Sequence, residues 1–140
     1  MIESQVLTQK EKLQLGLVGE ASVTVHEGNT AIGMRSGSVP VFATPALAGL
    51  MEEAAVAALA GVLDEGRTSV GTHLDLQHLA ATPIGMAVRA EARLMTIDGR
   101  RLIFRITAHD QIEQVGQATH QRMIVDQERF LSRTKAKLAG

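Results

Sequence analysis

The longest apolar stretch of the chain, Pro45 to Leu63, carries only two charges, near its middle. Its apolar residues recur at helical spacing on almost every side. Thr44-Pro45 is a strong helix start, because a threonine hydroxyl can cap the first turn and proline suits the first helical position. Gly66 fits the stop signal. The pattern predicts a helix from Thr44 to about Leu63 that other structure must wrap.

Period-two alternation of apolar and polar residues, typical of half-buried strands, fills most of the remaining chain. A first strand is predicted at 21–26, and the small residues between Gly33 and Pro40 predict a loop at the edge of a site. The Asp98-Gly99 pair favours a tight hairpin. Further strands are predicted at 70–78, 86–94, 102–108 and 118–124, and a short charged helix at 127–138 with Phe130, Leu131 and Leu138 as its anchors.

This order of elements predicts an α+β fold in which one long central helix is held against a curled antiparallel sheet, with an extra C-terminal helix. With 140 residues, 45% hydrophobic and 21% charged, the chain is expected to form one domain over 1–140. Residues 1–18 are expected to be a polar N-terminal lead, and 127–140 the C-terminal helix and tail.

Composition excludes several functions. The 14 basic and 15 acidic residues give a net charge of −1, and the only aromatic residues besides histidine are three phenylalanines, so nucleic acid is not an expected partner. The absence of cysteine removes disulfides, thiolate zinc sites and cysteine nucleophiles. No histidine spacing matches a metal site, and none is expected. Two adjacent carboxylates argue against a membrane span, and a cytoplasmic location is expected.

His78 is the first candidate for chemistry, because it follows Leu74 and Leu76 on the apolar face of its predicted strand. Gly71 and His73 are expected on the opposite face. A lone histidine in this position is more often a buried imidazole whose hydrogen bonds are satisfied by the backbone. His78 therefore becomes a functional candidate only if a partner side chain reaches it.

Glu52 and Glu53 are the candidate partners, since two carboxylates about 100° apart on an apolar helix cannot both avoid protein. A buried carboxylate needs a partner, although both side chains could also point along a narrow solvent strip. Periodicity does not choose between the two glutamates. Thr44 has two interpretations as well, either as a helix cap or as a hydroxyl placed near a polarised carbonyl.

Six motifs follow one another in the central part of the chain: Thr44 to Val56, Val70-Gly71-Thr72, His78 to Gly85, Asp98 to Leu102, Ala108-His109-Asp110 and Gly116 to Arg122. In this order, over residues 20 to 130, the chain resembles the fluoroacetyl-CoA thioesterase-like family. The resemblance implies a hot-dog fold and a homodimer with acyl-CoA sites at the subunit interface. It also implies thioester hydrolysis by Thr44, Glu52 and His78, with the Gly71 amide as an oxyanion donor and Arg122 near the site.

The resemblance has one departure. The specialised enzyme has phenylalanines in a lid before the helix, whereas residues 35–41 contain none and Phe42 is the only nearby ring. A fluorinated substrate is therefore not predicted. The expected activity is hydrolysis of a small or medium acyl-CoA, in which Glu52 either attacks to form a transient anhydride or orients water, His78 polarises the carbonyl, and Thr44 helps hold the carboxylate.

No separate cofactor is expected, because CoA is part of the substrate. One alternative is a non-catalytic protein of the same fold that binds acyl-CoA or the acyl acid. A hydratase would need an acid beside His78, and Asp75 is expected on the opposite strand face.

Overall fold

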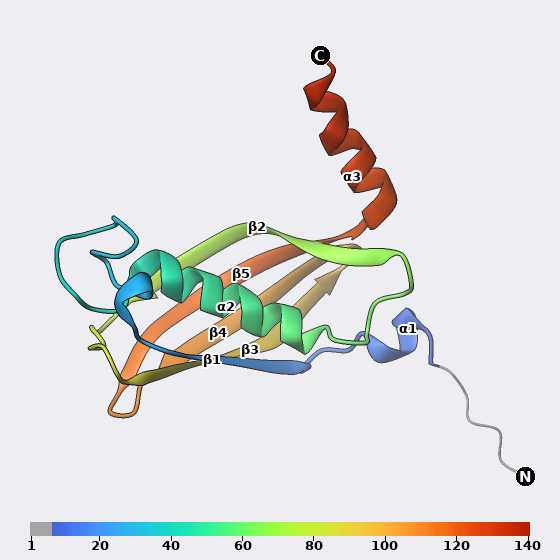
Figure 1. Cartoon of the computed structure of the whole chain (residues 1–140). Coiled ribbons are helices and arrows are strands. Elements are labelled where there is room, and N and C mark those ends of the chain that lie inside the picture. Colours follow the sequence, from blue (N-terminus) through green and yellow to red (C-terminus); the bar gives the residue numbers. More distant parts are fainter. Residues whose placement is uncertain (1–6) are drawn as a thin grey trace, which may run out of the picture.

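The fold is a curved antiparallel sheet of five strands with helix α2 lying across its concave face, in a computed structural model that describes residues 7–140 (Figure 1). The strand order in the sheet is β1-β3-β4-β5-β2, so β2 forms one edge. The α+β architecture predicted from the sequence is confirmed. The elements are α1 (Gln9–Lys12), β1 (Val18–Thr24), the 3₁₀ turn η1 (Glu27–Asn29), α2 (Thr44–Ala58), β2 (Arg67–His78), β3 (Ala87–Asp98), β4 (Arg101–His109), β5 (Gln114–Asp126), α3 (Gln127–Lys135) and the 3₁₀ turn η2 (Ala136–Leu138).

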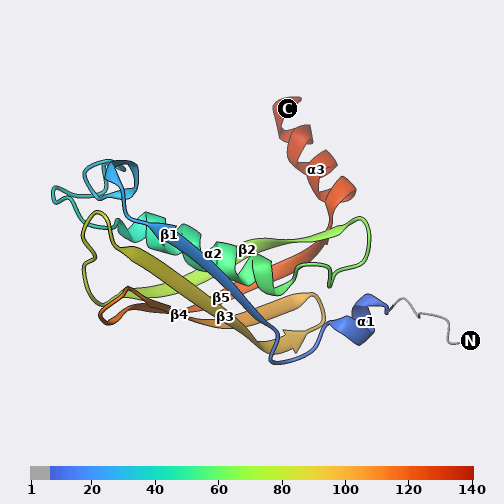
Figure 2. The same cartoon turned by 60° about the horizontal axis from the view of Figure 1, so that its bottom comes forward.

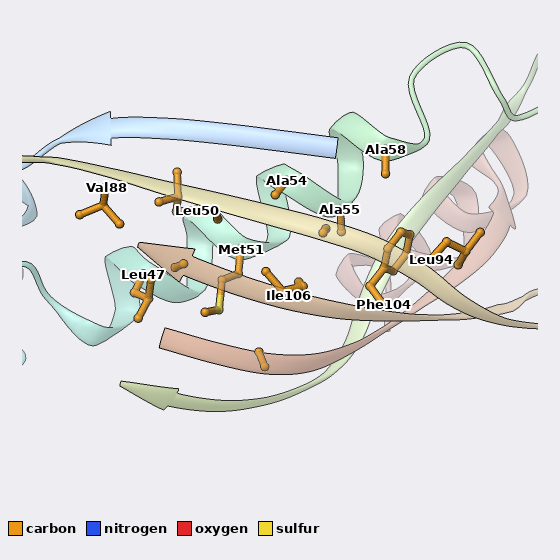
Figure 3. Close-up of a cluster of buried hydrophobic side chains, with 14 of the residues drawn as sticks. Leu47, Leu50, Met51, Ala54, Ala55, Ala58, Val88, Leu94, Phe104 and Ile106 are labelled. Atoms are coloured by element: carbon orange, nitrogen blue, oxygen red, sulfur yellow. The ribbon is translucent and has the colours of Figure 1, made fainter. Parts of the chain in front are cut away.

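The core lies between α2 and the concave face of the sheet (Figure 3). Each large apolar side chain buried there contributes about 1.5–3 kcal/mol relative to exposure. Alanines on α2 let the helix approach the sheet closely: a side chain at Gly19 on β1 would overlap the backbone of Ala54 and Ala58. The side chains that α2 buries are Leu47, Leu50, Met51, Ala54, Ala55 and Ala58.

Helix α2 is shorter than predicted. It ends at Ala58 rather than near Leu63, because the Leu59 amide closes a tighter turn on the Val56 carbonyl and Gly61 takes a positive φ of 70°. The curved sheet wraps one side of the helix as predicted, and Val56 on the other side is half-exposed in the protomer.

Strand β2 contains an irregularity that corrects the predicted faces. Its register with β5 shifts between Gly71 and His73, so Gly71 pairs with Arg122 and Leu74 pairs with His120. Because paired residues point to the same side of a sheet, Gly71 and Leu74 both lie on the concave face. The prediction that Gly71 lies opposite to Leu74 is therefore wrong, and Thr72 is the extra residue of the bulge.

The C-terminal helix α3 projects from the end of β5 past the edge strand β2 (Figure 1), and a second view shows the same projection (Figure 2). Asp126 caps it by accepting a hydrogen bond of 3.2 Å from the Arg129 amide. The helix is where the sequence predicts it, but its predicted anchors Phe130, Leu131 and Leu138 are exposed. Their anchoring role is thus not found within this protomer.

At the N-terminal end, residues 1–6 of the predicted lead lie outside the described residues, and the rest contains α1, capped by Thr8. Strand β1 begins at Val18, earlier than the predicted residue 21, because it pairs with β3 from Val18 onwards. Within residues 7–140, the structure contains no helix with the length and apolar character needed to cross a membrane.

Candidate active site

Thr44 and His78 form the first half of the candidate site. The Thr44 hydroxyl oxygen lies 2.7 Å from His78 Nδ1. Thr44 is the first residue of α2 and Ala43 holds the N-cap position, so the hydroxyl does not cap the helix. The structure thus favours the functional interpretation of Thr44 over the cap. The predicted contact between Thr44 and the Glu52 carboxylate is not found in the protomer, because the hydroxyl is engaged by His78.

The second ring nitrogen of His78, Nε2, is buried and has no hydrogen-bond partner among residues 7–140. Burial lowers the pKa of His78, and the nearby backbone of Ala80 acts in the opposite direction. The ring is therefore neutral at neutral pH, with one nitrogen protonated and the other a hydrogen-bond acceptor. An unpaired buried nitrogen is costly, and no group among residues 7–140 offsets this cost.

Glu52 and Arg122 form the second half. Glu52 Oε2 lies 3.8 Å from Arg122 Nη1, and the side chains are 45% and 7% exposed, respectively. A Cβ atom at Gly71 would lie only 2.8 Å from Glu52 Oε2, so the glycine leaves room for the carboxylate. Glu53 is exposed. Of the two glutamates, Glu52 is the one that contacts another site residue, which is the choice that the resemblance implied.

The Arg122 guanidinium is held by three further contacts. Nε donates to the Ser69 hydroxyl at 2.8 Å, and Nη2 donates to the Ser69 carbonyl at 3.1 Å. Nη1 lies 3.1 Å from His120 Nε2. Burial lowers the pKa of Arg122 while Glu52 raises it, and a guanidinium remains charged at neutral pH. The result is a fixed positive charge beside the half-exposed Glu52 carboxylate.

The two halves of the site lie apart within one protomer. Thr44 and Glu52 are eight residues apart on α2, which is about 12 Å along the helix axis. Gly71, beside Glu52, lies in the N-terminal half of β2, whereas His78 is its last residue, and about 20 Å of strand separates them. The structure therefore brings Thr44 to His78, and Glu52 to Gly71 and Arg122, but does not bring Glu52 to His78.

A groove of about 440 Å³ opens beside the Thr44–His78 pair. The predicted loop between Gly33 and Pro40 forms one wall, in agreement with its expected place at the edge of a site. Of the residues from 7 onwards that the structure describes, none with a charged side chain lines the groove. Its walls are Ala31, Ser36, Gly37, Val39, Val41, Phe42, Thr44, His78, Leu79, Ala80 and Ala81.

Two further residues of the site, His120 and Ser69, were not predicted from the sequence. His120 is buried and contacts Arg122, and both lie on the concave face of β5 with Ala118 and Ile124. The signal was present, because His120 and Arg122 follow the inward period of that strand. Within residues 7–140, no cluster of three or more histidine, aspartate or glutamate side chains is placed to hold a metal ion.

Comparison with known proteins gives one consistent family. The sequence profile described as fluoroacetyl-CoA-specific thioesterase matches residues 25–128. The fluoroacetyl-CoA thioesterase of Streptantibioticus cattleyicolor is 42% identical over 97 residues, which cover 69% of this chain and 70% of that protein.

Solved structures agree with the sequence comparison. The fluoroacetyl-CoA thioesterase FlK superposes with a TM-score of 0.84 at 34% identity, covering 89% of this chain and 97% of that one. A thioesterase superfamily member from Thermus thermophilus gives 0.80 at 25% identity, covering 90% and 96%. A hot-dog-like protein from Thermanaerovibrio acidaminovorans, at 23% identity and 0.85, shares the fold and covers 96% and 99%. This chain therefore belongs to the fluoroacetyl-CoA-specific thioesterase family, a family of thioester hydrolases, and it has the hot-dog fold.

Proposed function

We propose that this thioesterase hydrolyses a small or medium acyl-CoA to the free acid and CoA, and that Thr44, Glu52 and His78 carry the reaction. The observation that carries the proposal is the neutral His78 ring, oriented by Thr44 beside an uncharged groove. The relative FlK has been solved, as a variant, in complex with acetyl-CoA, which supports CoA as the carrier of the acyl group here.

The groove favours an uncharged, apolar acyl group. Val39, Val41 and Leu79 line it, and a charged acyl group would lose water there without gaining an ion pair. The loop before α2 brings no phenylalanine to the groove between residues 35 and 41. Phe42 is the one phenylalanine in the groove wall, and the neighbouring aliphatic residues leave room for a straight or branched chain, so fluoroacetyl specificity is not proposed.

A homodimer is part of this proposal, because a second copy can unite the two halves of the site. An edge strand exposes unpaired backbone groups that another strand can use. Strand β2 is such an edge, and it carries both Gly71 and His78. Antiparallel pairing of β2 with the same strand of a second copy places one end of β2 beside the other end of its partner.

The side-chain pattern of β2 limits the register, because inward-facing residues of one copy must pair with inward-facing residues of the other to keep both sets on one concave face. Among the registers that meet this condition, we choose the one that also unites the two halves of the site, in which Leu74 pairs with the partner's Leu76. The bulge at Thr72 then sets Gly71 opposite the partner's His78. Glu52, which lies beside Gly71, thereby comes near the partner's imidazole. This register centres the two-fold axis on Asp75.

The proposed chemistry follows from this arrangement. The Thr44 hydroxyl donates to His78 Nδ1, so Nε2 carries the ring proton and donates to the thioester carbonyl oxygen. The partner's Glu52 attacks the carbonyl carbon or accepts a proton from a water that attacks it. Collapse of the tetrahedral intermediate breaks the carbon–sulfur bond, and the CoA thiolate leaves. In the water route the thiolate takes up the proton that Glu52 accepted, and the free acid is released. In the attack route the thiolate takes up a proton from water, and a second water then hydrolyses the mixed anhydride, which releases the acid and restores the Glu52 carboxylate. The Gly71 amide is a proposed second donor to the oxyanion.

The remaining parts of the proposal are a cytoplasmic location and the absence of a separate cofactor. A chain without cysteine keeps its fold in a reducing compartment, because it has no disulfide to lose. CoA enters as part of the substrate, and the proposed steps use only carboxylate, imidazole, hydroxyl and backbone groups.

The test compares two neighbouring glutamates. Release of free CoA thiol is measured over straight, branched, aromatic and fluorinated acyl-CoAs for the wild type, Glu52→Gln and the matched control Glu53→Gln. Glu52→Gln is expected to lower kcat by about 10²- to 10⁴-fold, since it removes the base or nucleophile. Glu53→Gln is expected to keep wild-type rates, because its side chain is exposed.

Two outcomes contradict the proposal. Equal turnover by Glu52→Gln and the wild type removes the role of Glu52. Tight binding of acyl-CoA by the wild type without thiol release across the panel favours the non-catalytic binding protein.

A further inference from the structure

We propose that His120 is a positioning residue whose neutral ring holds the Arg122 guanidinium against Glu52, and that proton uptake by this ring releases Arg122 and lowers activity. This inference deepens the proposed function and rests on it. It concerns a buried residue to which neither the predicted motifs nor the mechanism above assigns a role.

The first contact of the His120 ring fixes the place of its proton. Nδ1 lies 2.8 Å from the backbone carbonyl oxygen of His73 on β2. A carbonyl oxygen only accepts hydrogen bonds, so Nδ1 carries the hydrogen. This bond ties the ring to the neighbouring strand just beyond the bulge.

The second contact uses the other nitrogen. Nε2 lies 3.1 Å from Arg122 Nη1, and a guanidinium group only donates. Nε2 therefore offers its lone pair, and the two contacts together define a single neutral tautomer. A doubly protonated ring can keep the bond to His73 but must lose the bond to Arg122.

The surroundings also favour the neutral ring. His120 is 1% exposed, and burial is the largest cause that lowers its pKa. The Arg122 charge and the His73 side chain lower it further, whereas the bond to the His73 carbonyl and the Glu52 charge raise it. The remaining neighbours include Ser69 from β2, which contacts Arg122, and Phe104 from β4, whose ring centroid lies 6.5 Å from that of His120.

The geometry of Arg122 explains why this one bond matters for Glu52. Ser69 occupies Nε and Nη2 of the guanidinium, which leaves Nη1 to face both His120 and Glu52. His120 thus fixes the nitrogen that lies nearest the carboxylate. A cation at His120 would place a second positive charge beside Arg122 in a buried site and displace one of the two groups.

The kinetic test uses two substitutions and one control. His120→Gln supplies one amide donor and one carbonyl acceptor and does not titrate, whereas His120→Leu supplies neither. His120→Leu is expected to lower kcat by about 10- to 100-fold, because a misplaced Glu52 no longer meets the reacting carbon, with KM changed less than twofold. His120→Gln is expected to keep most of kcat and to lose activity less steeply than the wild type as the pH falls below 6.5. His109→Gln, at an exposed histidine, is expected to match the wild type.

A purely structural role predicts different results. Wild-type kcat in His120→Leu, or an unchanged acid side of the pH–rate profile in His120→Gln, overturns the inference. Where His120→Leu does not fold, the His120→Gln profile alone decides.

A spectroscopic measurement separates this inference from the proposed function. Nitrogen-15 NMR of the resting protein at pH 7 reports which imidazole nitrogens carry hydrogen. The inference predicts a hydrogen on His120 Nδ1 and none on Nε2, with protonation of Nε2 only below the ordinary range. Hydrogen on Nε2 at pH 7 overturns it even if the protein hydrolyses acyl-CoA. Failure of the wild type to hydrolyse any acyl-CoA overturns the proposed function. The tautomer measured by NMR then still tests the contact between His120 and Arg122.

Discussion

The two ends of strand β2 are built differently. At the His78 end, a histidine–threonine pair borders an open groove and leaves Nε2 without a partner among the described residues. At the Gly71 end, the buried Arg122 guanidinium is hydrogen-bonded to Ser69 and to His120. The adjacent Glu52 carboxylate is half-exposed. Among the described residues, the groove at the His78 end has no carboxylate, whereas the Gly71 end has Glu52. In the proposed function these are two complementary halves of one site, which a second copy of the chain would bring together.

The largest expected effect on kcat comes from disrupting the contact between Thr44 and His78. Thr44→Val keeps the size of the side chain but removes the hydroxyl that orients His78, and kcat is expected to fall by about 100-fold. Thr44→Ser keeps the hydroxyl and is expected to retain most activity. Both variants should unfold at nearly the wild-type temperature, because the Thr44 side chain does not cap α2. Measured rates that are equal for the valine and serine variants would remove Thr44 from the account.

A smaller effect is expected at the Gly71 end. The added methyl group in Gly71→Ala would lie 2.8 Å from Glu52 Oε2, at the far end of a flexible side chain. The carboxylate can move aside, but His120 Cε1 at 3.3 Å and Arg122 Nη1 at 3.4 Å are held by hydrogen bonds, so the expected cost in unfolding free energy is about 1–2 kcal/mol. Activity should still fall about tenfold because Glu52 is displaced. Paired thermal unfolding and kinetic measurements check this, and a large loss of stability with normal kcat would show that the close contact only serves packing.

Acidification tests both ends through stability. The pKa values of His78 and His120 are lowered by burial, so the unfolded chain binds protons at these sites before the folded chain does. Stability is therefore fully present above pH 6.5 and falls as the pH decreases towards the folded pKa values. A histidine whose pKa in the folded state is lower than in the unfolded state by one unit costs about 1.4 kcal/mol of stability once the ring is protonated in both states. Denaturant unfolding between pH 7 and 5 should show this loss, and His120→Gln should reduce it. A stability independent of pH in this window contradicts the buried neutral rings.

The smallest expected effect tests the register that joins the two ends. The proposed two-fold axis sets Asp75 opposite its own copy, and like charges directly opposite each other weaken strand pairing by about 0.2–1 kcal/mol. Arg105 lines the same shallow groove as Asp75 and offsets part of this repulsion. Asp75→Asn is thus expected to tighten the dimer severalfold in sedimentation experiments, with Glu113→Gln, an exposed site away from the axis, as the control. A dimer that Asp75→Asn weakens would require a different register.

The sequence predicted the parts of the molecule that depend on periodicity. The alternation at 86–94 and 102–108 and the helical run from Thr44 correspond to β3, β4 and α2. The two-residue period of a strand could not assign Gly71 to the correct face of β2. The extra residue at Thr72 moves the residues before it to the face opposite the one that the period predicts. It also could not assign His120, since an inward-facing histidine looks the same whether it packs or holds a neighbour.

The candidate residues were found by motif, but their grouping was not. Thr44, Glu52 and His78 were expected to lie together, and the protomer separates Glu52 from the other two. A single chain carries no pattern that shows which of its residues meet across a symmetry axis. The resemblance supplied the dimer, and the edge position of β2 gives it a physical basis.

The central claim is that Glu52 of one protomer works with His78 of another. Glu52→Gln and His78→Ala are inactive alone by this account, and neither variant can form a complete site with itself. A mixed dimer of the two contains one site in which both substitutions meet and one site with both natural residues. Random exchange at equal amounts should therefore restore about a quarter of wild-type thiol release, since half of the dimers are mixed and each has one intact site. No recovery, although native mass spectrometry shows the mixed dimer, would contradict the claim.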